Sequence, residues 1–150
     1  MSTTSIFVKQ VLAQKGNRTF SVGTDTSVFD ALALMAEHDI GAVLVMTDDT
    51  LKGIFTERDY ARKVVLKGLT SRTATVGEMM TSNVFTISPD DDIASVMSTM
   101  THKRFRHLPV VDAGKVVGII TIGDVVKAVM DEQQATIQQL SSYIAGDLAT

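Results

Sequence analysis

Cysteine is absent from this sequence of 150 residues, and the sequence contains no long hydrophobic run. The absence of cysteine excludes a disulfide framework, a cysteine-ligated metal site and a cysteine nucleophile, and it fits a reducing compartment. The longest apolar runs, such as residues 42–46, are far too short to span a bilayer. The first residues also lack the basic segment and apolar stretch of a secretory signal. We therefore expect a cytoplasmic protein without a membrane partner.

Positive and negative side chains are nearly balanced in number. The chain has 14 Lys and Arg residues against 17 Asp and Glu residues, which gives a net charge of −3. This balance argues against nucleic acid as a partner, because general phosphate binding needs an excess of positive charge. Hydrophobic residues make up 45% of the chain, which is normal for a folded domain and too high for a disordered one.

Motifs for catalysis and metal binding are also missing. The three histidines, His38, His102 and His107, do not stand at the spacing of metal ligands, so we expect no metal site. The chain has neither a G-x-G-x-x-G fingerprint nor a P-loop, and no nucleophile stands beside a local base. We therefore predict that the protein is not an enzyme, with no catalytic residue and no catalytic cofactor.

The sequence does contain an internal repeat. One ungapped offset of 65 residues (85 − 20 = 65) aligns identical residues along both halves, and apolar positions between the identities keep their class. A repeat of this kind marks two copies of one structural unit. The aligned identities include Phe20 with Phe85, Gly53-Ile54 with Gly118-Ile119, and Asp59 with Asp124.

Each copy is predicted to form a β-α-β-β-α unit. Asp, Ser and Thr residues cluster before an apolar pattern of helical spacing that begins at Val28 and at Ile93, which is typical of a capped helix start. Short apolar runs flank a polar turn in both copies, as in a β-hairpin. The predicted strands are residues 19–22, 42–46 and 52–56 and residues 84–87, 108–111 and 116–121, and the second helices are residues 57–66 and 123–131.

A unit of this size cannot cover its own sheet, so we expect the two copies to pack together. The predicted fold class is α/β (α+β), with two pseudo-twofold-related β-α-β-β-α repeats packed sheet to sheet, plus a C-terminal helix. The predicted boundaries are 6–66 for repeat 1, 67–75 for a linker, 76–131 for repeat 2, and 132–150 for the C-terminal helix and tail.

The C-terminal helix carries a narrow apolar stripe. Ile137, Leu140 and Ile144 are spaced three and four residues apart on an otherwise polar helix. Such a stripe suits a helix that folds back onto its own domain, and it suits equally a helix that contacts a second copy. Both possibilities stay open at this point.

A Thr-x-x-Asp spacing stands where a strand gives way to a helix in both copies, at Thr56 and Asp59 and at Thr121 and Asp124. The free N–H groups of a helix start favour an anion, a hydroxyl can contact a phosphate or a sugar oxygen, and a carboxylate can accept from the two hydroxyls of a ribose. Thr-x-x-Asp is also close to a capping box, in which both side chains only close the helix start. On spacing alone, the capping interpretation is favoured.

Basic residues gather on the helix after Thr56 and again just before the buried strand of the second copy. Solvated faces explain most groups of this kind. Arg106 and His107, however, stand directly at a strand end, where open sheets often bind ligands. The equivalent Gly41 and Ala42 are small enough to let a flat ring approach the backbone.

The repeat, with residues 53–60 and 118–124, resembles a tandem pair of CBS domains, also called a Bateman module. The Arg-His-Leu-Pro-Val core of residues 104–111 is also typical of that family. The likeness covers about residues 6–131, and the chain is close to the small stand-alone CBS-pair proteins of bacteria. The resemblance implies two clefts between the repeats that bind adenosine compounds, namely AMP, ADP, ATP, and in some members NAD(H) or S-adenosylmethionine.

The resemblance also implies roles for individual residues. Asp59 with Thr56, and Asp124 with Thr121, would contact ribose and phosphate in the two clefts. In the Asp124 cleft, the resemblance implies that Ile40, Gly41 and Ala42 contact adenine and that Arg106 and His107 contact phosphate. In the Asp59 cleft, it implies that Phe105, Arg106 and His107 contact adenine and that Arg58, the counterpart of Gly123, contacts phosphate, with Arg62 behind it. Ile54 and Ile119 would lie beside the rings.

Each cleft offers only a few cations, which suits AMP, or NAD(H) through its AMP half, better than ATP, although ADP and ATP stay open because backbone N–H groups also bind phosphate. The resemblance implies a regulatory module that senses energy or redox state. Such a module would form a homodimer and would signal to an unknown protein target through a conformational or dimer change. The alternative is a protein-interaction adaptor with vestigial nucleotide clefts.

Overall fold

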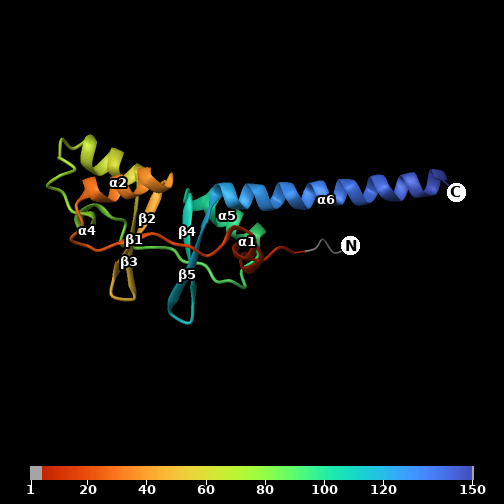
Figure 1. Ribbon diagram of the computed structural model, residues 1–150, viewed down its shortest axis with the longest axis horizontal. Coiled ribbons are helices and arrows are strands. Elements are labelled where there is room, and N and C mark those ends of the chain that lie inside the picture. The colour runs from red at the N-terminus through yellow and green to blue at the C-terminus, as the bar shows by residue number, and fades with distance from the viewer. Residues whose placement is uncertain (1–4, 150) are drawn as a thin grey trace.

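The computed structural model describes residues 5–149, with side chains through residue 144, and contains one small sheet from each repeat (Figure 1). In the first sheet, β1 (Ser21–Val22) pairs parallel with β2 (Ala42–Thr47), and β2 pairs antiparallel with β3 (Thr50–Thr56). The second sheet is the antiparallel pair of β4 (His107–Asp112) and β5 (Lys115–Thr121). Apart from residues 84–87, these are the strands predicted from the sequence.

The helices pack on the two sheets. They are α1 (Val8–Lys15), α2 (Val28–His38), α3 (Glu57–Asp59) with the π-helical turn η1 (Tyr60–Val65) that continues it, α4 (Val76–Met79), α5 (Ile93–Lys103) and α6 (Ile122–Ala149). Of these, α2, α3, α4 and α5 begin at polar caps. The Ser27 hydroxyl accepts from the backbone N–H of Asp30 at the start of α2, at 3.0 Å. The Asp92 carboxylate accepts from the N–H of Ala94 at the start of α5, at 2.7 Å. These caps lie where the Asp- and Ser-rich turns predicted them.

The two repeats exchange their entry helices. Val8 and Val11 of α1 are buried in the core of the second repeat, whereas Val76 of α4 is buried in the core of the first. Backbone hydrogen bonds fix both crossings, from Val8 N to the carbonyl oxygen of Asp91 at 2.9 Å and from Val76 N to that of Thr26 at 2.8 Å. Each core is therefore completed by the entry helix of the other repeat.

The sheets face one another across a third, smaller core. Leu44 and Ile54 of the first sheet are buried there, and Val116 and Ile119 of the second sheet pack against them. The opposite face of β2 presents Val45 to the helices of its own repeat. The predicted α/β fold of two repeats packed sheet to sheet is confirmed.

Residues 84–87 do not form the predicted strand. Only Ile87 pairs with β4, donating to the carbonyl oxygen of Pro109 at 3.0 Å and accepting from the N–H of Val111 at 2.8 Å. Val84 turns away because it packs against the core between the sheets. The apolar pattern of this segment therefore reflects burial between the repeats instead of a ladder of strand hydrogen bonds.

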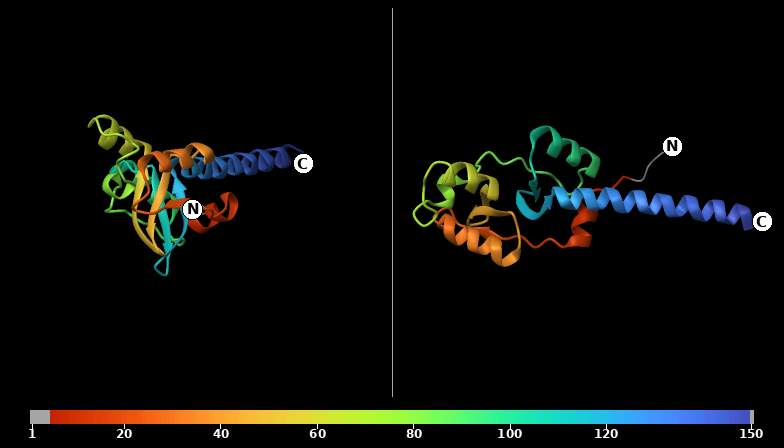
Figure 2. Two further views of the ribbon diagram at one scale, coloured as in Figure 1. Left: turned by 60° about the vertical axis from the view of Figure 1, so that its left-hand side comes forward. Right: turned by 90° about the horizontal axis from the view of Figure 1, so that it is seen from above.

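The C-terminal helix is not a separate element, because α6 runs without a break for 28 residues from the second repeat. It projects well beyond both lobes and does not fold back onto them (Figures 1 and 2). The side chains of residues 133–144 are all exposed. The fold-back possibility for the apolar stripe is therefore wrong. Within residues 5–149, every helix is too short or too polar to cross a membrane.

Gly53 lies where β3 meets the segment that enters the second repeat. A Cβ added to Gly53 would lie 2.7 Å from the carbonyl oxygen of Thr81 and 2.5 Å from Sδ of Met80. That oxygen also accepts from the N–H of Ile54 at 3.0 Å, so it cannot retreat freely. We expect Gly53→Ala to lower the free energy of unfolding by about 1–3 kcal/mol, measured by urea or thermal unfolding.

Gly23→Ala is the matched control for this substitution. The nearest atom to a Cβ at Gly23 is the Thr26 hydroxyl oxygen at 3.9 Å, which is ordinary contact. We expect Gly23→Ala to change the free energy of unfolding by no more than about 0.5 kcal/mol. Equal costs for the two variants would contradict the close approach at Gly53.

Candidate functional site

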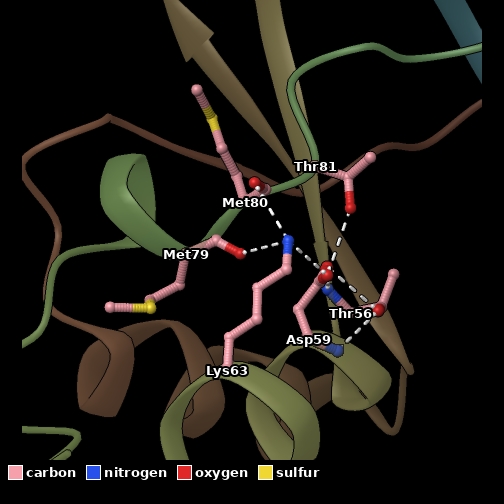
Figure 3. Close-up of polar contacts among 6 residues, drawn as sticks. All are labelled: Thr56, Asp59, Lys63, Met79, Met80 and Thr81. Atoms are coloured by element: carbon pink, nitrogen blue, oxygen red, sulfur yellow. Dashed lines mark hydrogen bonds and ion pairs between the residues drawn. The ribbon is translucent and has the colours of Figure 1, made fainter.

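Asp59 closes the helix start that follows β3. Its Oδ2 accepts from the backbone N–H of Thr56 at 3.0 Å and from the Thr56 hydroxyl at 3.1 Å, while the Asp59 N–H donates to that hydroxyl at 3.2 Å. This reciprocal pairing is a capping box (Figure 3). The capping interpretation of Thr-x-x-Asp is thus confirmed in the first repeat.

The second oxygen of Asp59 is also occupied. Oδ1 accepts from the Thr81 hydroxyl at 3.1 Å and lies 3.1 Å from Nζ of Lys63, one turn along the same helix (Figure 3). Lys63 donates further to the carbonyl oxygens of Met79 and Met80, at 3.1 and 3.3 Å. Asp59 is only 6% exposed, so this pairing compensates a charge that burial would otherwise make costly.

A cavity of about 500 Å³ opens beside Asp59 between the two repeats. Its size falls in the range of small-molecule sites. Three arginines line it, Arg58, Arg104 and Arg106, together with the acidic residues Glu57 and Asp59, of which Asp59 is already paired. The remaining lining residues are Gly41, Ile54, Thr56, Thr81, Asn83, Val84, Phe85, Phe105, His107 and Leu108.

The second Thr-x-x-Asp pair has the same cap but a different cation. The Thr121 N–H donates to Oδ2 of Asp124 at 2.9 Å, and the Asp124 N–H donates to the Thr121 hydroxyl at 3.1 Å. Nζ of Lys15 lies 2.6 Å from the same Oδ2 and donates to the carbonyl oxygen of Ile119 at 2.9 Å. Lys15 is the last residue of α1, so the N-terminal segment supplies the cation for this carboxylate.

His107 lines the cavity beside Asp59, and it also interacts electrostatically with Asp124 and Lys15. Burial lowers the pKa of His107 below its ordinary value of 6.5, the charges of Lys15 and Arg106 lower it further, and Asp124 opposes them. The imidazole is therefore neutral at pH 7, and it offers the cavity a hydrogen-bonding group without a positive charge.

The structure brings together most residues predicted for the Asp59 cleft, and it moves others. Gly41, predicted for the Asp124 cleft, lines the Asp59 cavity instead. Arg106 and His107, predicted for adenine in the Asp59 cleft and for phosphate in the Asp124 cleft, line the Asp59 cavity. Ile40 packs into the core of the first repeat, and Ala42 is buried between the sheets. The cavity is lined, as predicted, by Thr56, Arg58, Ile54, Asp59 and Phe105. Arg62 is exposed and lies outside this lining, and Ile119 packs between the sheets. The remaining predicted residues, Thr121, Gly123 and Asp124, lie at the start of α6.

The segment after α4, residues 81–85, was not predicted from the sequence to be part of the site. Thr81, Asn83, Val84 and Phe85 line the cavity because the chain crosses between the repeats at this point. The repeat register gave a usable signal, since any segment that connects the two copies must pass their interface. Arg104 belongs to the basic group just before the buried strand of the second copy, but only the structure places it at the cavity.

A metal site needs three or more ligand side chains that converge on one point. No group of three or more His, Asp or Glu side chains within residues 5–149 is placed to hold a metal ion.

Comparisons with known proteins give the same fold and repeat. The family model of the CBS domain matches residues 8–66 and 76–131. The mitochondrial CBS domain-containing protein CBSX3 of Arabidopsis thaliana is 39% identical over 128 residues, which make up 82% of this chain and 62% of that protein. The chain therefore spans less than two thirds of this relative.

Solved structures extend the similarity to three dimensions. The crystal structure of the CBS domain protein NE2398 has a TM-score of 0.82 and 42% sequence identity, and the match covers 85% of this chain and 99% of that one. The CBS domain pair of MJ0100, in complex with 5′-methylthioadenosine and S-adenosyl-L-methionine, has a TM-score of 0.76 and 25% identity, with 86% and 99% covered. CBS-pair proteins are generally regulatory, and these matches indicate no enzymatic family.

The neutral state of His107 predicts a pH dependence of stability. The folded-state pKa lies below that of the unfolded chain, so the unfolded chain takes up a proton first as the pH falls through 6.5. The stability present above pH 6.5 is therefore lost progressively toward the folded-state pKa. We expect His107→Gln to lose less stability than the wild type between pH 7 and pH 5, measured as the change in Tm.

His102→Gln serves as the control, because this histidine is exposed on α5. It removes a histidine that lies outside the cavity lining, and so it controls for the substitution itself. A loss in His107→Gln as large as that of the wild type would contradict the burial of a neutral imidazole.

Proposed function

Because this chain belongs to the CBS domain family, we propose that it is a regulatory module that binds an adenine nucleotide in the cavity between its repeats. The ligand is AMP, or NAD(H) through its AMP half. Binding reports energy or redox state to a protein target in the cytoplasm, and the module does no chemistry of its own. The binding of adenosine compounds by the MJ0100 pair supports the choice of ligand class.

The observation that carries this proposal is the charge and shape of the Asp59 cavity. Arg58, Arg104 and Arg106 line it from both repeats, and each can form charge-assisted hydrogen bonds with phosphate oxygens. Phe85 and Phe105 lie with ring centroids 6.2 Å apart beside these arginines and offer apolar area to a base. A phosphate-bearing adenosine fits this lining better than a cationic one such as S-adenosylmethionine.

Asp59 supplies the route from binding to a conformational change. Two partners already meet each oxygen of its carboxylate, so a ribose hydroxyl must take the place of one of them. The Thr81 hydroxyl is the neutral partner of Oδ1, and it is the one that lines the cavity. Thr81 is held by an antiparallel bridge to Ile54, with hydrogen bonds of 2.9 and 3.0 Å. The ligand therefore acts on the segment that links the repeats, and it favours whichever arrangement frees Asp59.

We expect adenosine and AMP to bind the nucleotide-free protein, with AMP the tighter ligand. Arg58→Gln and Arg106→Gln remove guanidinium groups whose side chains are exposed, so the fold should persist. Each should weaken AMP binding by about tenfold or more and leave adenosine binding nearly unchanged, because only AMP carries the phosphate. Isothermal titration calorimetry with adenosine, AMP, ADP, ATP, NAD and NADH measures both.

Arg62→Gln is the matched control. This side chain is exposed on η1, one turn beyond Arg58, and does not line the cavity. A similar loss of AMP binding in Arg62→Gln would show that general charge, not the cavity, attracts the nucleotide. If no adenosine compound binds the protein, the proposal is wrong and the adaptor function with vestigial clefts takes its place.

We also propose that the protein is a homodimer held by α6. Apolar side chains recur at alternating intervals of four and three residues, with Ile137 and Ile144 at one core position of a heptad and Leu140 at the other. Isoleucine and leucine in this order favour two parallel strands. Residues 133–144 contain no charged side chain, so two identical helices would not repel each other.

Ile137→Lys combined with Leu140→Lys should convert the dimer to a monomer, because it places like charges in the seam of two exposed helices. Sedimentation velocity measures the mass, and circular dichroism checks the fold. Ala135→Lys combined with Ser142→Lys adds the same charge at the heptad position opposite the seam and should remain a dimer. A dimer that survives in the first variant would place the contact elsewhere.

A further inference from the structure

The cavity beside Asp59 contains a second carboxylate, that of Glu57, which has no cationic partner. Glu57 is the first residue of α3, and its side chain is exposed and lines the cavity. Its backbone N–H donates to the carbonyl oxygen of Gly41 at 3.1 Å, which ties the start of α3 to the residue before β2. Within residues 5–144, no ion pair joins the Glu57 carboxylate to a lysine, an arginine or a histidine.

This carboxylate stands over Gly41, where the missing side chain leaves room for a ligand. A Cβ added to Gly41 would lie 3.6 Å from Oε1 of Glu57 and 3.4 Å from Nε2 of His107. The carboxylate and the imidazole therefore border the same space. Because its lowered pKa keeps His107 neutral at pH 7, the imidazole does not offset the negative charge of Glu57.

The charged side chains of the cavity add up to an excess of two positive charges. Its three arginines contribute three. Asp59 is paired with Lys63 at 3.1 Å, so these two groups cancel. Glu57 is the remaining charged residue of the lining, and it removes one positive charge from the total (3 − 1 = 2).

We infer that Glu57 sets how many phosphates the cavity accepts, and that it favours a nucleoside monophosphate over a triphosphate. This inference rests on the proposed function, and it states which nucleotide the site selects. A monophosphate carries about two negative charges at pH 7, which equals the positive excess of the lining. Each further phosphate adds about one negative charge, which the lining leaves unmatched while Glu57 repels it.

The equivalent position of the second repeat shows that the fold does not require an acid here. An acidic residue in the first turn complements the helix dipole, which is an alternative reason for Glu57. The 65-residue register, however, places Ile122 at this position (57 + 65 = 122). Since α6 begins at Ile122 with the same Thr-x-x-Asp cap, the carboxylate of Glu57 is particular to the Asp59 cavity.

The repulsion between Glu57 and a ligand grows with the charge of the ligand. At a separation of about 6 Å, one pair of unit charges changes an affinity by about 3-fold to 100-fold, for effective dielectric constants of about 80 to 20. Removal of the carboxylate should therefore leave adenosine binding unchanged and strengthen AMP binding modestly. The gain should be larger for ADP and largest for ATP.

Glu57→Gln tests this inference, because it removes the charge and keeps the size of the side chain. Isothermal titration calorimetry with adenosine, AMP, ADP and ATP in magnesium-free buffer measures the affinities. The wild type should bind AMP more tightly than ATP. In Glu57→Gln the affinity for ATP should rise by about tenfold or more, the affinity for AMP should rise less, and that for adenosine should not change.

The dependence on salt separates charge repulsion from a structural effect. Raising the ionic strength from about 0.1 M to 1 M shortens the screening length from about 10 Å to 3 Å. Most of the ATP gain of Glu57→Gln should disappear at the higher salt concentration. A gain that came from a changed helix start would persist.

Glu37→Gln is the matched control. It changes the net charge of the chain by the same amount, and the Glu37 side chain is 71% exposed on α2 and lies outside the cavity lining. It should leave all four affinities as they are in the wild type. Glu57→Ala is the second variant and should give the same order of gains, and thermal unfolding establishes that each variant is folded.

The outcomes separate this inference from the proposed function. If neither the wild type nor any variant binds adenosine or AMP, the proposed function fails and this inference with it. If nucleotides bind but Glu57→Gln gains nothing, or gains equally for AMP and ATP, only the role of Glu57 is wrong. A wild type that binds ATP as tightly as AMP, or a Glu37→Gln that gains as much as Glu57→Gln, would also overturn it.

Discussion

The exchange of entry helices between the repeats is the constraint on which the rest of the structure depends. A repeat of this length has too little chain to cover its sheet, so Val8 and Val11 complete the second core and Val76 completes the first. Because α1 and α4 each pack on the other repeat, the residue that ends α1 lies at the start of α6, and the segment after α4 lies at the start of α3. Lys15 therefore arrives at Asp124 and Thr81 arrives at Asp59, although each pair is far apart in sequence. The sites are a consequence of how the cores are closed.

The cap and the candidate site share the same atoms. Thr56 and Asp59 satisfy backbone N–H groups that the start of α3 leaves free, which stabilises the helix whether or not a ligand is present. The same carboxylate is nearly buried and must be compensated, which explains why Lys63 and Thr81 converge on it. Capping and charge compensation are thus two uses of one carboxylate, and under the proposed function a ligand would have to replace one of its existing partners.

Much of the fold could be predicted from the sequence because the repeat and the hydrophobic periods are local patterns. The helix starts at Val28 and Ile93 and the hairpins of both copies follow from residues close together in the chain. The segment at Val84 was mistaken for a strand because burial between two sheets and burial within one give the same apolar pattern. The site was predicted in part: Thr56, Asp59, Arg58 and Phe105 lie together at the cavity, whereas Ile40 and Ala42 belong to cores. Lys15 and Thr81 could not be found, because no local period reports which segment crosses to the other repeat.

The second Thr-x-x-Asp pair and the protruding helix are built from one set of groups. Thr121 and Asp124 cap the start of α6, and the N–H of Ile122 donates to the carbonyl oxygen of Arg106 at 2.9 Å, at the edge of the second sheet. A continuous helix of 28 residues transmits a tilt at its first turn along its whole length, because its backbone hydrogen bonds resist bending. The cap at Thr121 and the ion pair of Asp124 with Lys15 therefore fix the first turn of α6. Because the helix continues unbroken from that turn, the same contacts set where its exposed apolar stripe lies.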